Sequence, residues 1–276
     1  MSRRRHHHCE HFRAFTLVEL LVVISVIALL VSILLPGLRK ARSQAKRIAC
    51  QANLRQIAVA WDEYLGANKG RFLQGTNANV NFGGRQGLGG PAYGGDNPNN
   101  PPVVNQPKPK VLNPYLKLPE VVWDSAEVFA CPADKGSEYI GPTFFSHYGN
   151  SYNANPMLID QTQLPVPPFT QPACRKPLLI TVNKRLPDMR ISCVTANPSQ
   201  LILVGDHGWR QAYAYNSTQR IEWHDAKHMH NLVFLDGHAS FTRIRKGLDV
   251  TAEYTVLPFR DLHAEAAACH VEISDD

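Results

Sequence analysis

The feature that most constrains this chain is an uninterrupted apolar run near its N-terminus. From Phe15 to Leu35 the sequence reads FTLVELLVVISVIALLVSILL, twenty-one residues with one charged side chain, Glu19, and without Gly or Pro. A helix of this length is about 30 Å long, which matches the hydrocarbon core of a bilayer. The run is longer than the apolar part of a secretory signal, and no small-x-small cleavage site follows it. The sequence therefore predicts a membrane-inserted helix over residues 15–35.

Basic residues gather at the same end of the chain. The formal net charge is +6, from 29 Lys and Arg against 23 Asp and Glu. Residues 1–14 carry four Arg, and residues 39–55 carry six Lys or Arg and no acid, so the rest of the chain is slightly acidic. A nucleic-acid-binding surface needs basic residues spread over the folded body. Nucleic acid is therefore not an expected partner.

Glu19 is the anomaly of the apolar run. An ionised carboxylate inside an apolar helix costs roughly 2.5–3.5 kcal/mol on membrane-insertion scales. One interpretation is that Glu19 lies shallowly and reaches toward the interface. The other is that its charge has a partner or a function.

The residues around Glu19 favour the second interpretation. The sequence RAFTLVEL at residues 13–20 resembles the processing site of type IV prepilins and type II secretion pseudopilins. The resemblance implies that a prepilin peptidase cuts a basic leader, residues 1–14, from the chain between Ala14 and Phe15 and methylates the new N-terminus. It also implies that Glu19 pairs with the Phe15 amine of a neighbouring subunit. The family usually has Gly where this chain has Ala14.

The helix is expected to continue past Pro36, over residues 36–66. Pro36 itself lies where the pilin-like family commonly has a helix-kinking proline. Apolar residues recur at three- to five-residue steps, which predicts an amphipathic helix with one face on a folded body. This stripe consists of Leu38, Ala41, Ala45, Ile48, Ala52, Ile57, Trp61 and Leu65. The basic residues of 39–55 would form a solvated face, or the first of them would contact anionic headgroups.

Residues 67–276 are expected to form a globular body with a long loop rich in Gly, Asn and Pro over residues 74–110. The glycines of this loop lack the Lys-Ser/Thr of a phosphate-binding loop. Further on, residues 198–206 read as a buried strand between two turns. Two more strand-like runs flank Asp236-Gly237, a hairpin signal that predicts positive φ at both turn residues. The predicted fold class is α+β, pilin-like, with the long N-terminal helix packed on a C-terminal antiparallel sheet.

The body adds to the pilin-like resemblance. A Cys-x-x-Asn-Leu-Arg-Gln segment at Cys50–Gln56, a Cys-Pro at Cys131 and a Phe-x-Asp-Gly-His sequence at Phe234–His238 are similar to those of a large bacterial pilin-like group. Apart from Cys9 in the leader, the chain has five Cys. One or two disulfides are expected in an oxidising periplasm, and the sequence leaves their pairing open.

Histidine and aspartate are concentrated in residues 206–238. Imidazole nitrogen and carboxylate oxygen are ligands of Zn²⁺ and similar ions. The candidate metal ligands are His228, His230, Asp236 and His238. The alternative is a tight turn with ordinary histidines around it and no cofactor. Neither a Ser/His/Asp nor a Cys/His pattern identifies a catalytic site.

Two functional hypotheses follow. The first is a non-enzymatic pilin-like subunit in the inner membrane, with a cytoplasmic N-terminus, a periplasmic or filament-borne body, and copies or paralogues as partners. The second is a membrane-tethered periplasmic metal-binding protein or enzyme that uses the His/Asp-rich region. The first requires Glu19 and a processed Phe15, whereas the second does not. A secretion pseudopilus, a surface pilus and a DNA-uptake filament are all compatible with the first.

Overall fold

The computed structural model describes residues 17–74, 78–87, 109–137, 142–159, 174–213 and 221–269. Its first helix, α1 (Leu17–Ala67), has 51 residues and contains Pro36. It unites the predicted membrane segment and the predicted amphipathic continuation in one helix. By its contacts the chain divides into a unit of residues 1–42 and a unit of residues 43–276.

In the first unit, α1 has no charged side chain between Leu20 and Leu38. Its most apolar stretch has no residue buried inside the structure, and the helix is long and apolar enough to cross a membrane. The hydroxyl of Ser25 donates to the carbonyl oxygen of Leu21, and that of Ser32 donates to the carbonyl oxygen of Leu29, each at 2.7 Å. A hydroxyl bonded to its own helix needs no water, so both serines are compatible with a lipid environment.

In the second unit, one face of α1 joins the hydrophobic core. The buried residues on this face are Cys50, Leu54, Ile57, Ala58, Ala60, Trp61 and Leu65. Trp61 is completely buried and contacts the rings of Phe72 and Phe82 at centroid distances of 6.1 and 6.0 Å. Burying a large side chain stabilises the fold by about 1.5–3 kcal/mol, so this face anchors the helix to the body.

The predicted stripe on this part of α1 combined two faces and is partly wrong. Ile57, Trp61 and Leu65 are buried as expected. The earlier members of the stripe are exposed, namely Ala41, Ala45, Ile48 and Ala52. The physical reason is the five-residue step from Ala52 to Ile57. Each residue turns a helix by about 100°, so a five-residue step leads about 140° away from the first face.

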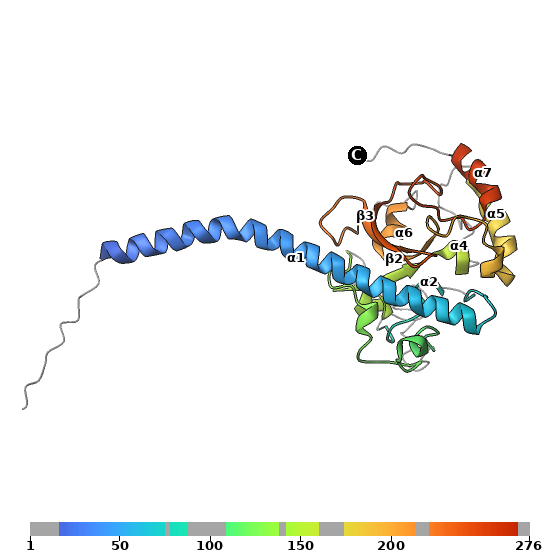
Figure 1. Cartoon of the computed structure of the whole chain (residues 1–276), viewed down its shortest axis with the longest axis horizontal. Helices are drawn as coiled ribbons and strands as arrows, with labels where there is room; N and C mark the ends of the chain where they lie inside the picture. Colours follow the sequence, from blue (N-terminus) through green and yellow to red (C-terminus); the bar gives the residue numbers. More distant parts are fainter. Residues whose placement is uncertain are drawn as a thin grey trace, which may run out of the picture. The chain divides into compact units, whose positions relative to one another are not determined.

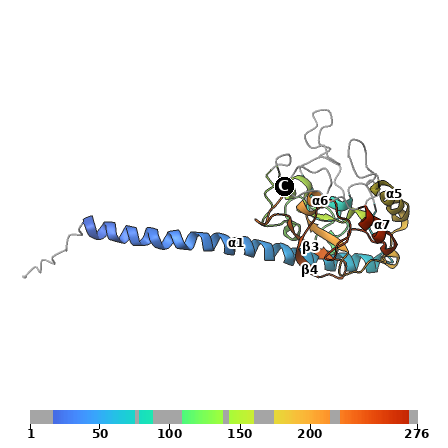
Figure 2. The same cartoon turned by 90° about the horizontal axis from the view of Figure 1, so that it is seen from above.

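The sheet is a four-stranded antiparallel meander in the order β1-β2-β3-β4. Its strands are β1 (Tyr152–Ala154), β2 (Ile202–Asp206), β3 (Met229–Phe234) and β4 (Ala239–Arg243). All five residues of β2 are buried, as the sequence predicted. Asn53 of α1 donates to the hydroxyl of Tyr152 at 3.2 Å, and in both views the sheet lies beside the C-terminal part of the helix (Figure 1, Figure 2). The predicted α+β class is confirmed.

Short helices surround the sheet. They are α2 (Ala78–Asn81), α3 (Phe144–Tyr148), α4 (Pro156–Ile159), α5 (Arg175–Arg185), α6 (Gly208–Tyr213) and α7 (His263–Ala268). Within the described residues, five 3₁₀ turns cover Asn113–Leu116, Glu127–Phe129, Leu186–Asp188, Ile191–Cys193 and Arg260–Leu262. Helix α2 lies within the predicted loop 74–110, of which residues 75–77 and 88–108 are outside the described residues.

Two disulfides settle the pairing that the sequence left open. Cys50 of α1 is bonded to Cys131, and Cys174 is bonded to Cys269, while Cys193 is an exposed free thiol. The bonds join residues 81 and 95 positions apart, and chain entropy predicts a stabilisation of about 4–5 kcal/mol for each such loop. The second disulfide ties together the segments that carry α5 and α7, which lie side by side (Figure 1).

The predicted hairpin forms between β3 and β4, with a different turn from the one expected. The Gly237 N–H donates to the Phe234 carbonyl at 2.9 Å, and the Phe234 N–H donates to the His238 carbonyl at 3.0 Å. The loop therefore has three residues, a turn closed by a left-handed glycine. Gly237 has φ +86, whereas Asp236 is not among the residues with positive φ. The prediction of a two-residue turn with positive φ at both Asp236 and Gly237 is therefore wrong.

Gly237 provides a stability test of this turn. A Cβ at Gly237 would meet no atom within 4 Å, so a substitution there acts through the backbone conformation alone. We expect Gly237→Val to lower the free energy of unfolding by about 1–2 kcal/mol, because a left-handed conformation opposes a β-branched side chain. Gly237→Asn, which tolerates this conformation, is the matched control and should lose less. Denaturant unfolding of the full chain in detergent measures both, and equal stability of all three proteins would contradict the turn.

Candidate functional site

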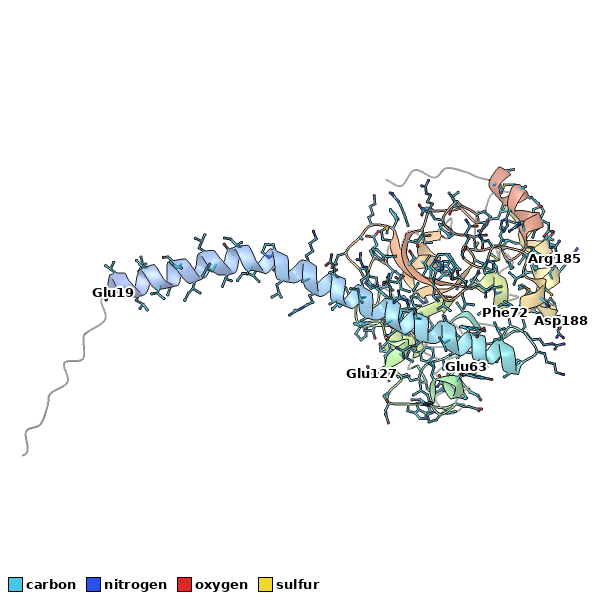
Figure 3. All side chains as sticks on the ribbon, in the orientation of Figure 1. Glu19, Glu63, Phe72, Glu127, Arg185 and Asp188 are labelled. Atoms are coloured by element: carbon cyan, nitrogen blue, oxygen red, sulfur yellow. A yellow bond between two sulfur atoms is a disulfide. The ribbon has the colours of Figure 1, made fainter. Side chains whose placement is uncertain are left out.

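The first candidate site is the N-terminal end of α1. Glu19 lies in the first turn of the helix (Figure 3), where the partial positive charge of a helix N-terminus stabilises a carboxylate. Ala14 and Phe15, the predicted cleavage and methylation residues, lie outside the described residues. The pairing of Glu19 with a neighbour's Phe15 amine therefore stays a prediction.

The helix that follows Glu19 exposes its side chains all round. The large apolar residues between Leu17 and Leu35 are 45% to 81% exposed. Water is an unfavourable environment for so much contiguous apolar surface, which marks a membrane or protein interaction site. This part of α1 is thus suited to be covered by lipid or by apolar helices of other subunits.

The second candidate site is a buried polar cluster at the end of β2, formed by Asp206, His224, His230 and Asn231. Asp206 is 2% exposed. One carboxylate oxygen accepts from Nδ1 of His230 and the other from the backbone N–H of Asn231, both at 2.8 Å. A buried carboxylate is tolerated when it is hydrogen-bonded in this way. The cluster therefore joins β2 to β3.

His224 connects the cluster to α1. Its Nε2 accepts from Nδ2 of Asn231 at 2.9 Å and lies 3.8 Å from Sγ of Cys131, which is bonded to Cys50 of α1. Burial lowers the pKa of His224, and this desolvation outweighs the opposing attraction of Asp206. The ring is therefore neutral at neutral pH and can use the Nε2 lone pair as an acceptor or a metal ligand.

The four predicted metal ligands do not form one group. His230 bonds Asp206, whereas His228 precedes β3 with φ +60 and its N–H donates to a carboxylate oxygen of Glu222. Asp236 and His238 lie at the hairpin turn and bond each other at 2.6 Å. The length of β3, about 20 Å from His230 to Asp236, separates the two pairs.

A different set of ligand-type side chains does converge. Within the described part of the chain, three ligand-type side chains converge at Cys50, Cys131 and His224, whose ligand atoms all lie within 4.8 Å of one another, with the two sulfurs bonded to each other in the disulfide. His224 and Asp206 stood in the His/Asp-rich region of the sequence, but nothing in their spacing separated them from the other candidates. The two Cys lie far from that region in sequence.

His207, next to Asp206, is a buried histidine in an aromatic setting. Its ring lies 4.0 Å from the ring of Phe144 and 5.7 Å from that of Tyr148, centroid to centroid. Desolvation, with smaller contributions from Arg210 and His147, lowers the pKa of His207 to about 3. The native state therefore keeps this ring neutral through the pH range in which the unfolded chain binds a proton.

This pKa shift predicts acid sensitivity. Above the ordinary histidine pKa of about 6.5, the neutral His207 ring does not reduce the free energy of unfolding. As the pH falls from there toward about 3, the unfolded chain binds a proton that the native state does not, so the free energy of unfolding decreases by up to about 1.4 kcal/mol per pH unit. We expect His207→Phe to make the free energy of unfolding less dependent on pH between 6.5 and 4. Guanidinium unfolding at several pH values measures this slope, and an unchanged slope in the variant would refute the buried neutral histidine.

Comparison with known proteins concerns the N-terminal end. Residues 11–35 match the prokaryotic N-terminal methylation motif, and no curated protein or solved structure matches the chain. The motif implies processing by a prepilin peptidase and assembly with other pilin subunits, a structural rather than enzymatic class. Together with the apolar helix it supports membrane anchoring. The motif, the long N-terminal helix and the antiparallel sheet together support a place for the chain in the type IV pilin-like class.

Proposed function

We propose that this protein is a subunit of a type II secretion or type IV pilus-type filament, cut between Ala14 and Phe15 and assembled through α1. The observation that carries the proposal is the N-terminal methylation motif at the start of a helix that exposes apolar side chains all round. A membrane-tethered enzyme needs an anchor, but it does not need a carboxylate such as Glu19 within that anchor.

The proposed topology places the leader in the cytoplasm and the body in the periplasm or in an extracellular filament. The basic leader and the processing motif support the cytoplasmic side for the N-terminus. The two disulfides support an oxidising compartment for the body, because disulfides persist mainly outside the cytosol. The protein is then a single-pass inner-membrane protein before it is assembled.

Glu19 supplies the proposed assembly contact. After cleavage the Phe15 amine of one subunit and the Glu19 carboxylate of another would lie in the same apolar layer. Each charge alone is costly there, and breaking a buried ion pair by removing one partner costs roughly 3–5 kcal/mol. An intermolecular pair would therefore fix how far one subunit is shifted along the filament axis relative to the next.

The second half of α1 supports contact with a second copy. Opposite its buried face, α1 presents an exposed apolar track, which consists of Ala45, Ile48, Ala52 and Val59. Ile48 and Val59 are each 59% exposed, and they share this face with the exposed alanines. The alanines would let a neighbouring helix approach closely.

The Glu19→Leu variant tests this function in the native host. We expect it to enter the membrane and to lose its leader as the unaltered protein does, because the peptidase is expected to read the basic leader and Ala14. Its recovery with the assembled filament should fall by about tenfold or more. Each 1.4 kcal/mol of lost binding free energy lowers an equilibrium constant tenfold, and loss of the ion pair is expected to cost more than this at each contact. Crosslinking and co-purification with the other subunits measure assembly.

Glu127→Leu is the matched control, because it removes an exposed carboxylate from the body (Figure 3). This variant should assemble normally. Normal assembly of Glu19→Leu would show that the proposed axial pairing is wrong, and the protein would then fit a tethered periplasmic module better than a filament subunit.

A further inference from the structure

The disulfide between α1 and the body has an unusual neighbour. Cys50 and Cys131 are buried, and so is the imidazole of His224, whose Nε2 lies 3.8 Å from Sγ of Cys131. Sulfur and imidazole nitrogen are preferred ligands of Zn²⁺ and other thiophilic ions.

The distances resemble those of a metal site. Two ligands of one tetrahedral Zn²⁺, with a Zn–S bond of 2.3 Å and a Zn–N bond of 2.0–2.1 Å, are about 3.6 Å apart. The separation between Cys131 Sγ and His224 Nε2, 3.8 Å, is close to this value. The Cα atoms of Cys50 and Cys131 are 5.2 Å apart, so side-chain rotation can separate the two sulfurs once the bond between them is broken.

We propose that the reduced protein binds one thiophilic divalent cation, such as Zn²⁺, through Cys50, Cys131 and His224, and that formation of the disulfide abolishes this site. Reduction by a thiol or phosphine transfers two electrons to the S–S bond and adds a proton to each sulfur. Binding of the ion then releases both thiol protons, because the thiolate is the ligand. The proposal is independent of filament assembly.

The surroundings support the His224 ligand. Asn231 donates to the Nε2 lone pair at 2.9 Å and its Nδ2 is also 3.5 Å from the carbonyl oxygen of Arg47. The ion would replace Asn231 at Nε2, while the Asn231 amide keeps the Arg47 carbonyl as a partner. The carboxylate of Asp206 lies 3.7 Å from the same nitrogen.

The second disulfide is an internal control. Cys174 and Cys269 belong to no group of metal-ligand side chains within the described ranges, and Sγ of Cys174 lies 3.7 Å from the carbonyl oxygen of Cys269. The reductant is used in excess, until peptide mass analysis finds both disulfides open. Nonspecific binding of Zn²⁺ to free thiols would therefore occur at both cysteine pairs, whereas the proposed site contains only Cys50 and Cys131.

Cysteine alkylation of the unaltered full chain in detergent tests the site without a mutation. The protein is reduced with a phosphine, given one equivalent of Zn²⁺ or none, and treated with iodoacetamide before peptide mass analysis. We expect Zn²⁺ to slow alkylation of Cys50 and Cys131 by about tenfold or more, because a metal-bound thiolate is a poor nucleophile. Cys174, Cys193 and Cys269 should react at unchanged rates. Equal rates with and without Zn²⁺, or equal protection of both pairs, would overturn the proposal.

A pair of histidine variants tests the third ligand. We expect His224→Gln to weaken Zn²⁺ binding to the reduced chain by about tenfold or more in competition with a chromophoric chelator. His238→Gln, which removes the hairpin histidine, should bind as the unaltered protein does. Equal affinity of all three proteins would exclude His224 as a ligand. The alkylation result stands even if one variant folds poorly.

Discussion

A single helix that must satisfy two surroundings is the constraint on which the rest of this structure depends. Over its first half, α1 exposes apolar side chains in every direction, so only lipid or other apolar helices can cover it. Over its second half, the face with Leu54, Ile57 and Trp61 is buried in the core of the body. The helix is thus both the anchor and part of the core, and removing the part of α1 that the body buries would expose that core.

Polar and covalent contacts complete the attachment of this helix. Hydrophobic burial has no direction, so it does not by itself fix the rotation of α1 against the sheet. The Cys50–Cys131 bond and the hydrogen bond from Asn53 to Tyr152 do so. The buried cluster around Asp206 lies in the same region. Leaving one of its polar groups without a hydrogen bond would be costly, so the cluster permits only packing arrangements that keep these bonds. As a result, the side of α1 that carries Ile48 and Val59 is exposed on the surface of the body.

The sequence was informative wherever structure depends on neighbouring residues. The apolar run, the motif around Glu19, the buried strand β2 and the hairpin at Gly237 are local patterns, and their structural elements are present. The predicted stripe on α1 was wrong at the five-residue step from Ala52 to Ile57, because a step of one residue too many turns the next side chain by about 100° onto another face of the helix. The turn at Asp236 differed because loop length is set by how the strands pair.

Long-range contacts were beyond a single sequence. The metal prediction grouped His228, His230, Asp236 and His238 by closeness in the chain, but an extended strand places neighbours in sequence far apart in space. The converging set, Cys50, Cys131 and His224, spans much of the chain, and only the fold brings it together. Disulfide pairing has the same origin, since five Cys allow several pairings with similar spacings.

The central claim is that this chain is a processed subunit whose new N-terminus, Phe15, lies two residues before the start of α1 at Leu17. Its most direct test is intact-mass and N-terminal peptide analysis of the protein isolated from the membranes of its native host. The account predicts a chain that starts at N-methylated Phe15 and lacks residues 1–14. A mature chain that still carries Met1 to Ala14 would contradict it, because the Phe15 amine that Glu19 is proposed to bind would not exist.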